Sequence, residues 1–130
     1  MKQRVIIQNR SRPLASPIIA YNCASFWCRL RGLTFRRDLP PGDGLLLVQS
    51  RENKLDASIH MLFVWFDLTV VWINSAGKVV DVRLAKSWHP LYFPRQPAQY
   101  VLELAVARRD DFAIGDHVGF EFVRDEVINT

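Results

Sequence analysis

Four arginines, a histidine and a run of aromatic residues are the side chains of this 130-residue sequence whose types and spacing could do chemistry. The arginines fall within nine residues, at Arg29, Arg31, Arg36 and Arg37. Guanidinium groups bind carboxylates and phosphates through paired hydrogen bonds. This segment therefore predicts a site for an anion, and we expect Arg29 and Arg36 to supply its positive charge.

His60 is the second candidate. It alternates with Ile59, Met61 and Phe63, so we expect those three to face the core while His60 faces the other way. A histidine placed in this way can act as a hydrogen-bond donor, an acid or a base near neutral pH. The alternative is that its ring only bonds a backbone carbonyl.

A third candidate is the connection formed by residues 85–97. At 13 residues it is longer than most connections, which favours either a binding role or a cap on the core. It contains Trp88, Tyr92, Phe93 and Arg95, residue types that are enriched in binding hot spots. We expect Trp88 and His89 to form an aromatic wall beside a ligand. The alternative is that Trp88 and Phe93 close the end of a barrel.

The sequence lacks the motifs of several other kinds of functional site. The chain has no glycine-rich phosphate loop, no nucleophile elbow and no His-Glu-x-x-His motif. Cys23 and Cys28 are its only cysteines, and with the scattered histidines they do not make a four-ligand zinc set. Five positions apart on one helix, they would point about 140° away from each other. We therefore expect buried or half-buried thiols without a disulfide, and neither a metal nor a cofactor.

Strands must position most of these residues. Strand-like runs fall at residues 5–7, 17–21, 44–48, 57–66, 68–73, 78–84, 100–104 and 117–122. The runs at 68–73 and 78–84 flank a short turn that ends in Gly77, which predicts a hairpin. The pattern predicts a mainly β fold, an antiparallel sandwich or a partly closed barrel of about eight strands.

One short helix is expected at about residues 23–35. Its apolar stripe consists of Cys23, Phe26, Trp27, Leu30 and Leu33. Gly32 suits the end of such a helix. This helix would carry Arg29.

Length and composition indicate a single domain over residues 1–130, with 49% hydrophobic and 23% charged residues. No apolar run approaches the roughly 18 residues of a membrane span. The basic N-terminus is followed by only three apolar residues, too few for a signal peptide, so we expect a cytoplasmic protein. These features do not predict the oligomeric state.

The net charge of +4 is unevenly distributed. The first 37 residues contain eight basic residues and no acidic one, whereas the rest of the chain carries all 13 acids. Segregation of this kind indicates an anionic partner. The alternative is that the fold brings the two parts together and each neutralises the other.

The order of the motifs resembles the domain of unknown function 192 family, a prokaryotic family without an established activity. The matching segments are RLRGLTFR (29–36), LPPGDGLLL (39–47), SIHMLFVWF (58–66), VVWI (70–73), GKVV (77–80) and YVLEL (100–104). The resemblance covers about residues 24–122 and implies a compact, mainly β fold with a short helix. Arg29, Gly32, Leu33 and His60 match its pattern. Members commonly carry Pro and Asp two positions apart after the histidine segment, where this sequence has Asp67 and Thr69.

These observations favour a non-enzymatic module that binds a small anionic ligand or an acidic partner surface through Arg29, Arg36, His60, Trp88 and His89. An enzyme is the alternative, with His60 as general base and Asp67 orienting it. A nucleic-acid partner is the third hypothesis, less favoured because no RNA- or DNA-binding motif is present.

Overall fold

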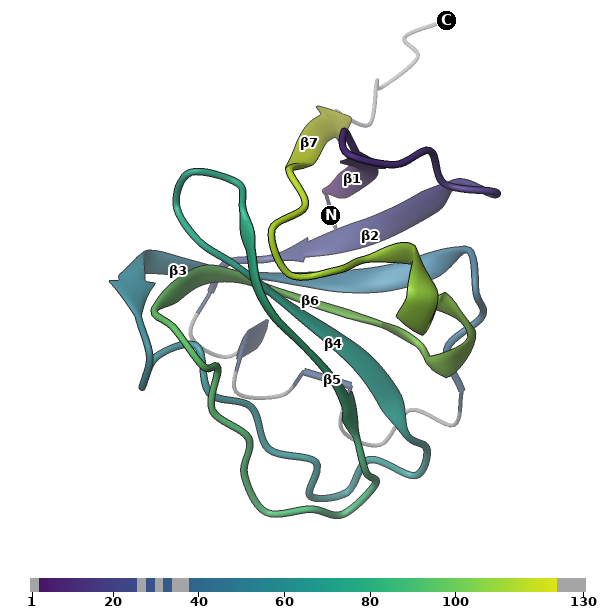
Figure 1. The fold of residues 1–130 in the computed structure, drawn as a ribbon. Coiled ribbons are helices and arrows are strands. Elements are labelled where there is room, and N and C mark those ends of the chain that lie inside the picture. The colour runs from purple at the N-terminus through teal and green to yellow at the C-terminus, as the bar shows by residue number, and fades with distance from the viewer. Residues whose placement is uncertain (1–2, 26–27, 30–31, 34–37, 124–130) are drawn as a thin grey trace, which may run out of the picture.

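The structure is a computed structural model. It describes residues 3–25, 28–29, 32–33 and 38–123. Its strands are β1 (Arg4–Asn9), β2 (Ile18–Cys23), β3 (Asp43–Asn53), β4 (Leu68–Ile73), β5 (Val79–Ala85), β6 (Ala98–Ala105) and β7 (Val118–Val123). A short 3₁₀ helix, η1 (Val106–Asp111), follows β6. Figure 1 shows the strands as one strongly twisted sheet. The predicted mainly β fold is confirmed.

The strands form one mixed sheet in the order β5-β4-β6-β3-β2-β1-β7. Among the described strands, every neighbouring pair is antiparallel except β2 and β3. A bridge between Lys78 and His117 joins the starts of the two edge strands, but the sheet is not closed into a barrel. A parallel pair needs a crossover connection, and residues 24–42 supply it. The predicted helix lies in this crossover.

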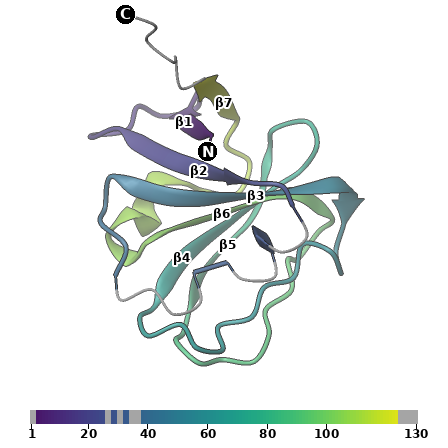
Figure 2. The same cartoon turned by 180° about the vertical axis from the view of Figure 1, so that it is seen from behind.

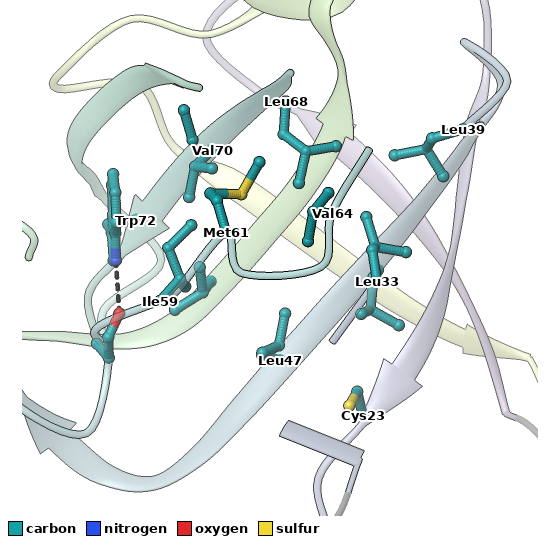
Figure 3. Close-up of a cluster of buried hydrophobic side chains, with 14 of the residues drawn as sticks. Cys23, Leu33, Leu39, Leu47, Ile59, Met61, Val64, Leu68, Val70 and Trp72 are labelled. Atoms are coloured by element: carbon teal, nitrogen blue, oxygen red, sulfur yellow. Dashed lines mark hydrogen bonds between the residues drawn. The ribbon is translucent and has the colours of Figure 1, made fainter. Parts of the chain in front are cut away.

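Strand β4 is an interior strand, second from the β5 edge, and is buried on both faces. Leu68, Val70 and Trp72 belong to one hydrophobic cluster, whereas Val71 and Ile73 belong to the other. The first cluster is covered by the crossover and by the loop of residues 54–67, and Figure 3 shows Leu33, Ile59 and Val64 in it. The second cluster is covered by β1, β2 and residues 112–118.

The expected strand at residues 57–66 was wrong. This segment forms turns beside the loop of residues 86–97, and the two loops lie side by side at the end of the molecule away from the C-terminus (Figures 1 and 2). A single bridge in this described segment joins Ile59 to Tyr92. Phe63 adopts a positive φ of 60°, which ends any extended run. The loop instead serves as a lid on the first cluster, with Ile59, Met61 and Val64 buried.

The helix begins later than expected. Cys28 and Arg29 are helical, but Cys23 is the last residue of β2. Ser25 starts the helix, because its hydroxyl accepts a hydrogen bond from the Cys28 N–H (3.1 Å) and its carbonyl from the Arg29 N–H (3.0 Å). The remaining stripe residues, Phe26, Trp27 and Leu30, lie outside the described residues, as does Arg36.

A disulfide joins Cys23 to Cys28, with 5.4 Å between their Cα atoms. The prediction of two unpaired thiols was wrong, because it placed both cysteines on one helix. With Cys23 at the end of a strand and Cys28 in the first helical turn, the two side chains meet. The disulfide fastens the residue next to Arg29 to the end of β2.

Candidate functional site

A cavity of about 340 Å³ lies on the face of the sheet that the crossover and the loop of residues 54–67 cover. Small-molecule sites begin at about this size. The crossover contributes Arg29, Gly32 and Leu33, and strands β3 and β6 contribute Gln49 and Glu103. Segments far apart in the sequence thus build one concave site.

The helical turn fixes the Arg29 side chain at the rim of the cavity. Ser25 caps the turn, and the disulfide at Cys28 holds it from the other side. The Nη1 of Arg29 donates a hydrogen bond of 2.7 Å to Oε1 of Gln49, a buried residue of β3. A guanidinium has five N–H donors, so this bond orients the group and leaves donors for a ligand.

Glu103 lies at the base of the cavity, on the interior strand β6. It follows Val101 by two residues and therefore points to the same covered face. Its residue is 4% exposed, and its Oε1 atom has no hydrogen-bond partner among the residues that the structure describes. Burial raises the pKa of this carboxyl to about 7, because a low-dielectric surrounding disfavours the charged form.

Gly32 closes the crossover over this carboxyl. Its φ of +50° lies in the left-handed region, where other residues are strained. A Cβ atom at this position would lie 3.6 Å from Oε1 of Glu103. The expected stop at Gly32 is present, and the turn it makes packs directly on the acid.

His60 lines the cavity from the loop of residues 54–67. Its neighbours Ile59 and Met61 are held by backbone hydrogen bonds, from the Ile59 N–H to the Tyr92 carbonyl and from the Met61 N–H to the His89 carbonyl. Both are buried, whereas His60 is half-buried. The loop pairing therefore presents the His60 ring to the same space as Arg29.

Five aliphatic side chains form the apolar part of the lining. The side chains concerned are those of Leu33, Leu47, Ile59, Val64 and Leu91. Figure 3 shows Leu33, Leu47 and Val64 grouped between the crossover and the sheet. Leu91 brings the loop of residues 86–97 into the lining. The cavity thus combines a charged rim, a buried acid and an apolar wall.

The other residues expected in the site lie elsewhere. The Trp88 ring, 41% exposed, packs on Phe63 and Trp65 with centroid distances of 5.0 and 5.1 Å, and it does not line the cavity. The His89 ring stacks on Tyr92 at 4.3 Å, also outside the lining. The structure therefore brings Arg29 and His60 together, but not the aromatic pair.

Asp67, expected to orient His60 in an enzyme, has other partners. Its Oδ1 accepts a hydrogen bond of 2.8 Å from the Ser87 N–H, and its Oδ2 lies 4.0 Å from the Lys86 ammonium group. It does not line the cavity. Asp67 ties the start of one loop to the start of the other.

Sequence reasoning missed Glu103 and Gln49. A usable signal was present at Glu103, because residues 101–104 read as a strand that is apolar on both sides apart from this one acid. An acid is seldom placed in such a strand without a partner or a function. Gln49 extends the apolar run of β3, and only the position of the crossover shows what it contacts.

No cluster of three or more potential metal ligands occurs in the described part of the chain. Nor does any described helix have the length and apolar character needed to cross a membrane.

Comparison with known proteins identifies the family. The model of the DUF192 family, described as "Uncharacterized ACR", matches residues 8–120. The chain belongs to the DUF192 family. This DUF192 chain is 35% identical over 99 residues to a UPF0127 protein of Thermococcus gammatolerans, covering 75% of the chain and 63% of that protein. It is 32% identical over 99 residues to a UPF0127 protein of Thermococcus sibiricus, covering 75% and 62%. The chain thus spans less than two thirds of these relatives' lengths.

Two solved structures share the fold of this DUF192 chain. One is a "putative transcription regulator" from Sinorhizobium meliloti 1021, with a TM-score of 0.78 at 22% identity, covering 92% of this chain and 94% of that one. The other is a protein of unknown function from Novosphingobium aromaticivorans, with a TM-score of 0.74 at 18% identity, covering 89% and 83%. At these identities the likeness shows the fold alone.

Proposed function

We propose that this DUF192 chain is a binding module for a small carboxylate with an aliphatic body. The observation that carries the proposal is the cavity in which the Arg29 guanidinium, the buried Glu103 carboxyl and five aliphatic side chains meet. The guanidinium would bind the carboxylate on the side of the cavity that Glu103 lines, and the aliphatic side chains would bind the body.

Charge favours an anionic ligand. Arg29 is held by a neutral partner, Gln49, so the bond that orients the guanidinium does not cancel its charge. His60 adds a second nitrogen-bearing side chain to the lining. Asp56 also lines the cavity, but its carboxylate lies 3.9 Å from the Arg51 guanidinium, which offsets its charge.

A compact carboxylate fits better than a phosphate. A phosphate carries up to two negative charges and is bound in proteins by several cationic or backbone N–H donors. Among the described residues the cavity offers one arginine and one histidine, beside two acids. A single charge with an apolar tail therefore matches both halves of the lining.

The test is a binding measurement with straight-chain carboxylates from butanoate to octanoate. We expect hexanoate to bind and hexanol, which has the same body without the charge, to bind far more weakly. Arg29→Met should lower hexanoate affinity roughly ten- to a hundredfold, the value of a charge-assisted hydrogen bond. Arg109→Met, at an exposed arginine of η1, is the matched control and should bind as the wild type does. If no member of the series binds, the proposed function is wrong.

An enzyme is the second candidate, favoured by one observation. A carboxyl whose pKa is raised to about 7 in a cavity beside a histidine suits general acid–base catalysis. In this version Glu103 and His60 act, rather than His60 and Asp67. Hydrolysis of 4-nitrophenyl hexanoate that is lost in both His60→Ala and Glu103→Gln would support it, and binding of hexanoate without turnover would support the binding module.

The charged N-terminal part gives less support to a large acidic or nucleic-acid partner. Arg12 forms an ion pair of 2.9 Å with Asp116 from the other end of the chain, so part of the segregated charge is neutralised within the fold. Nucleic acid, the third hypothesis from the sequence, can be tested by one assay. Binding to mixed oligonucleotides that falls steeply with salt would support it.

The disulfide bears on the compartment. The expectation of a cytoplasmic protein came from the N-terminal sequence, but disulfides persist mainly in oxidising compartments. We propose that the chain works where Cys23 and Cys28 stay oxidised. Thiol labelling of the protein trapped in its source cells would test this, since labelled cysteines would indicate a reducing compartment.

A further inference from the structure

We infer that Glu103 enters the complex as a neutral carboxylic acid and donates its proton in a hydrogen bond to the carboxylate of the ligand. This inference rests on the proposed function, since it names the second polar contact of the same site. It makes binding of the anion take up a proton wherever Glu103 is ionised beforehand.

Glu103 lines the cavity in which the ligand would bind. It does so from β6, is 4% exposed, and has an Oε1 atom without a hydrogen-bond partner among the described residues. Buried polar groups are nearly always bonded. The residue lines the cavity and its carboxyl makes no hydrogen bond at Oε1, so the group has hydrogen-bonding capacity that a bound molecule can use.

The surroundings keep this acid neutral. On β3 its register partner is Leu45, and on β4 it is Val70. Strand β4 carries no ionisable side chain. Strand β3 contributes Gln49 to the lining, and its side-chain amide is neutral. Within the described ranges no cation lies within ion-pair distance of Glu103, and burial raises its pKa to about 7.

Three ionisable groups face the same cavity from the elements packed around it. They are Arg29 from the crossover and Asp56 and His60 from the loop of residues 54–67. Arg29 favours an anion in the cavity that Glu103 also lines, so we place the incoming carboxylate between the guanidinium and the acid. A second negative charge beside Glu103 raises its proton affinity further, because two adjacent carboxylates cannot both ionise freely.

The proton balance of the complex follows. At about pH 6 Glu103 already holds its proton, and the ligand carboxylate binds without exchange with solvent. Above about pH 8 Glu103 is ionised in the free protein, and each ligand bound takes one proton from the buffer onto Glu103. Because binding then takes up one proton, the affinity for the ligand carboxylate must fall about tenfold per pH unit above about pH 8.

A cationic ligand is the competing use of the same acid. An amine would bind an ionised Glu103, but the Arg29 guanidinium in the same lining repels it. Hexylammonium has the body of hexanoate with the opposite charge. Its binding in preference to hexanoate would overturn both the inference and the proposed function.

The experiment is calorimetry of sodium hexanoate binding from about pH 6 to about pH 9, where the ligand stays ionised, in pairs of buffers with different heats of ionisation. For the wild type we expect close to one proton taken up per ligand above about pH 8, none at about pH 6, and the tenfold fall in affinity per unit. Glu103→Gln, whose amide N–H donates at every pH, should bind with an affinity that does not vary with pH. Glu121→Gln, at an exposed acid of β7, is the matched control and should behave as the wild type does.

The outcomes separate the two proposals. Binding without proton uptake would overturn the inference and leave the proposed function standing. Proton uptake that persists in Glu103→Gln would assign the proton to His60 and also overturn it. The wild-type measurement needs no variant, so the inference stays testable even if Glu103→Gln does not fold. Absence of hexanoate binding at every pH would overturn the proposed function and the inference with it.

Discussion

Two buried carboxyl groups, Asp116 and Glu103, sit on opposite sides of this sheet in contrasting surroundings. Asp116 receives hydrogen bonds from the Asn9 amide, the Ala113 N–H and the Arg12 guanidinium. Burial opposes its charge, but these bonds outweigh burial and hold the pKa of Asp116 below its usual value. Glu103 has the burial without the bonds, and its pKa is raised to about 7.

The difference separates a structural acid from a binding one. The bonds of Asp116 tie β1 and the segment after it to the loop before β7, elements far apart in the sequence. Nothing in the described chain uses Oε1 of Glu103 in that way, and a cavity lies beside it. One side of the protein is closed by a satisfied acid, whereas the other keeps an unsatisfied acid facing a space for a ligand.

The largest expected effect comes from removing the structural acid. Asp116→Ala should lower the free energy of unfolding by about 3–4 kcal/mol, because it leaves one N–H of the buried Asn9 amide and the Ala113 N–H without their acceptor beside Arg12. Chemical denaturation at neutral pH measures this loss. Asp110→Ala, at an exposed acid of η1, should change stability by less than about 0.5 kcal/mol. Equal losses of stability in Asp116→Ala and Asp110→Ala would show that Asp116 has no special structural role.

Asp116 should also make the free energy of unfolding decrease at acidic pH. Because its folded pKa lies below its unfolded pKa, its contribution is present above the usual value of 3.8 and is lost as the pH falls through the folded pKa. Asp116→Ala should make this decrease smaller, and denaturation midpoints measured at decreasing pH would show it.

Glu103 predicts the opposite slope at higher pH. Its folded pKa of about 7 exceeds the usual 4.5, so the folded state holds the proton longer and stability falls as the pH rises between these values. Glu103→Gln should remove this fall and gain roughly 2–3 kcal/mol relative to wild type between about pH 4.5 and about pH 8, at about 1.4 kcal/mol per pKa unit. Denaturation at both ends of the range checks it, and a wild-type profile without this slope would contradict it.

Loss of the disulfide should have a smaller effect, concentrated on the cavity side. Cys23→Ser with Cys28→Ser removes a short closed loop, which is worth about 2 kcal/mol of stability. Since Cys28 adjoins Arg29, hexanoate affinity should fall as well. Thermal unfolding and calorimetry of the oxidised protein and the double variant test this. Unchanged affinity would show that capping by Ser25 suffices to position Arg29.

The smallest effect is expected at the exposed aromatic cluster of Phe63, Trp65 and Trp88. Trp88→Ala should cost about 1 kcal/mol, the value of its ring contacts, and should leave hexanoate affinity unchanged because Trp88 does not line the cavity. A large loss of hexanoate affinity would instead support the aromatic wall that the sequence predicts beside the ligand.

Much of the fold could be predicted because local patterns decide it. The runs at 68–73 and 78–84 around Gly77 predicted a hairpin, and β4 and β5 do pair in this way, because a hairpin depends on neighbouring residues alone. The parallel pairing of β2 with β3 could not be predicted, since it depends on how the crossover packs. The segment of residues 57–66 has strand-forming residues, yet its pairing with a neighbouring loop makes it a cover instead.

The site was predicted only in part, because the sequence shows residue types but not where a cavity forms. Arg29 and His60 stood out by residue type, and the fold brings them to one cavity. Glu103 was missed because alternation places it on a face but does not show that this face carries a cavity. The disulfide was missed because the apolar stripe continues through Cys23, whereas the helix starts only at Ser25.

The central claim is that Glu103 is a buried acid kept neutral up to about pH 7 for want of a protein partner. Its most direct test is a carbon-13 NMR titration of the glutamate side-chain carboxyls, with the Glu103 signal assigned by its absence in Glu103→Gln. We predict a midpoint near 7 for the free protein and a higher one with hexanoate bound. A midpoint near the usual 4.5 that hexanoate does not move would contradict the account.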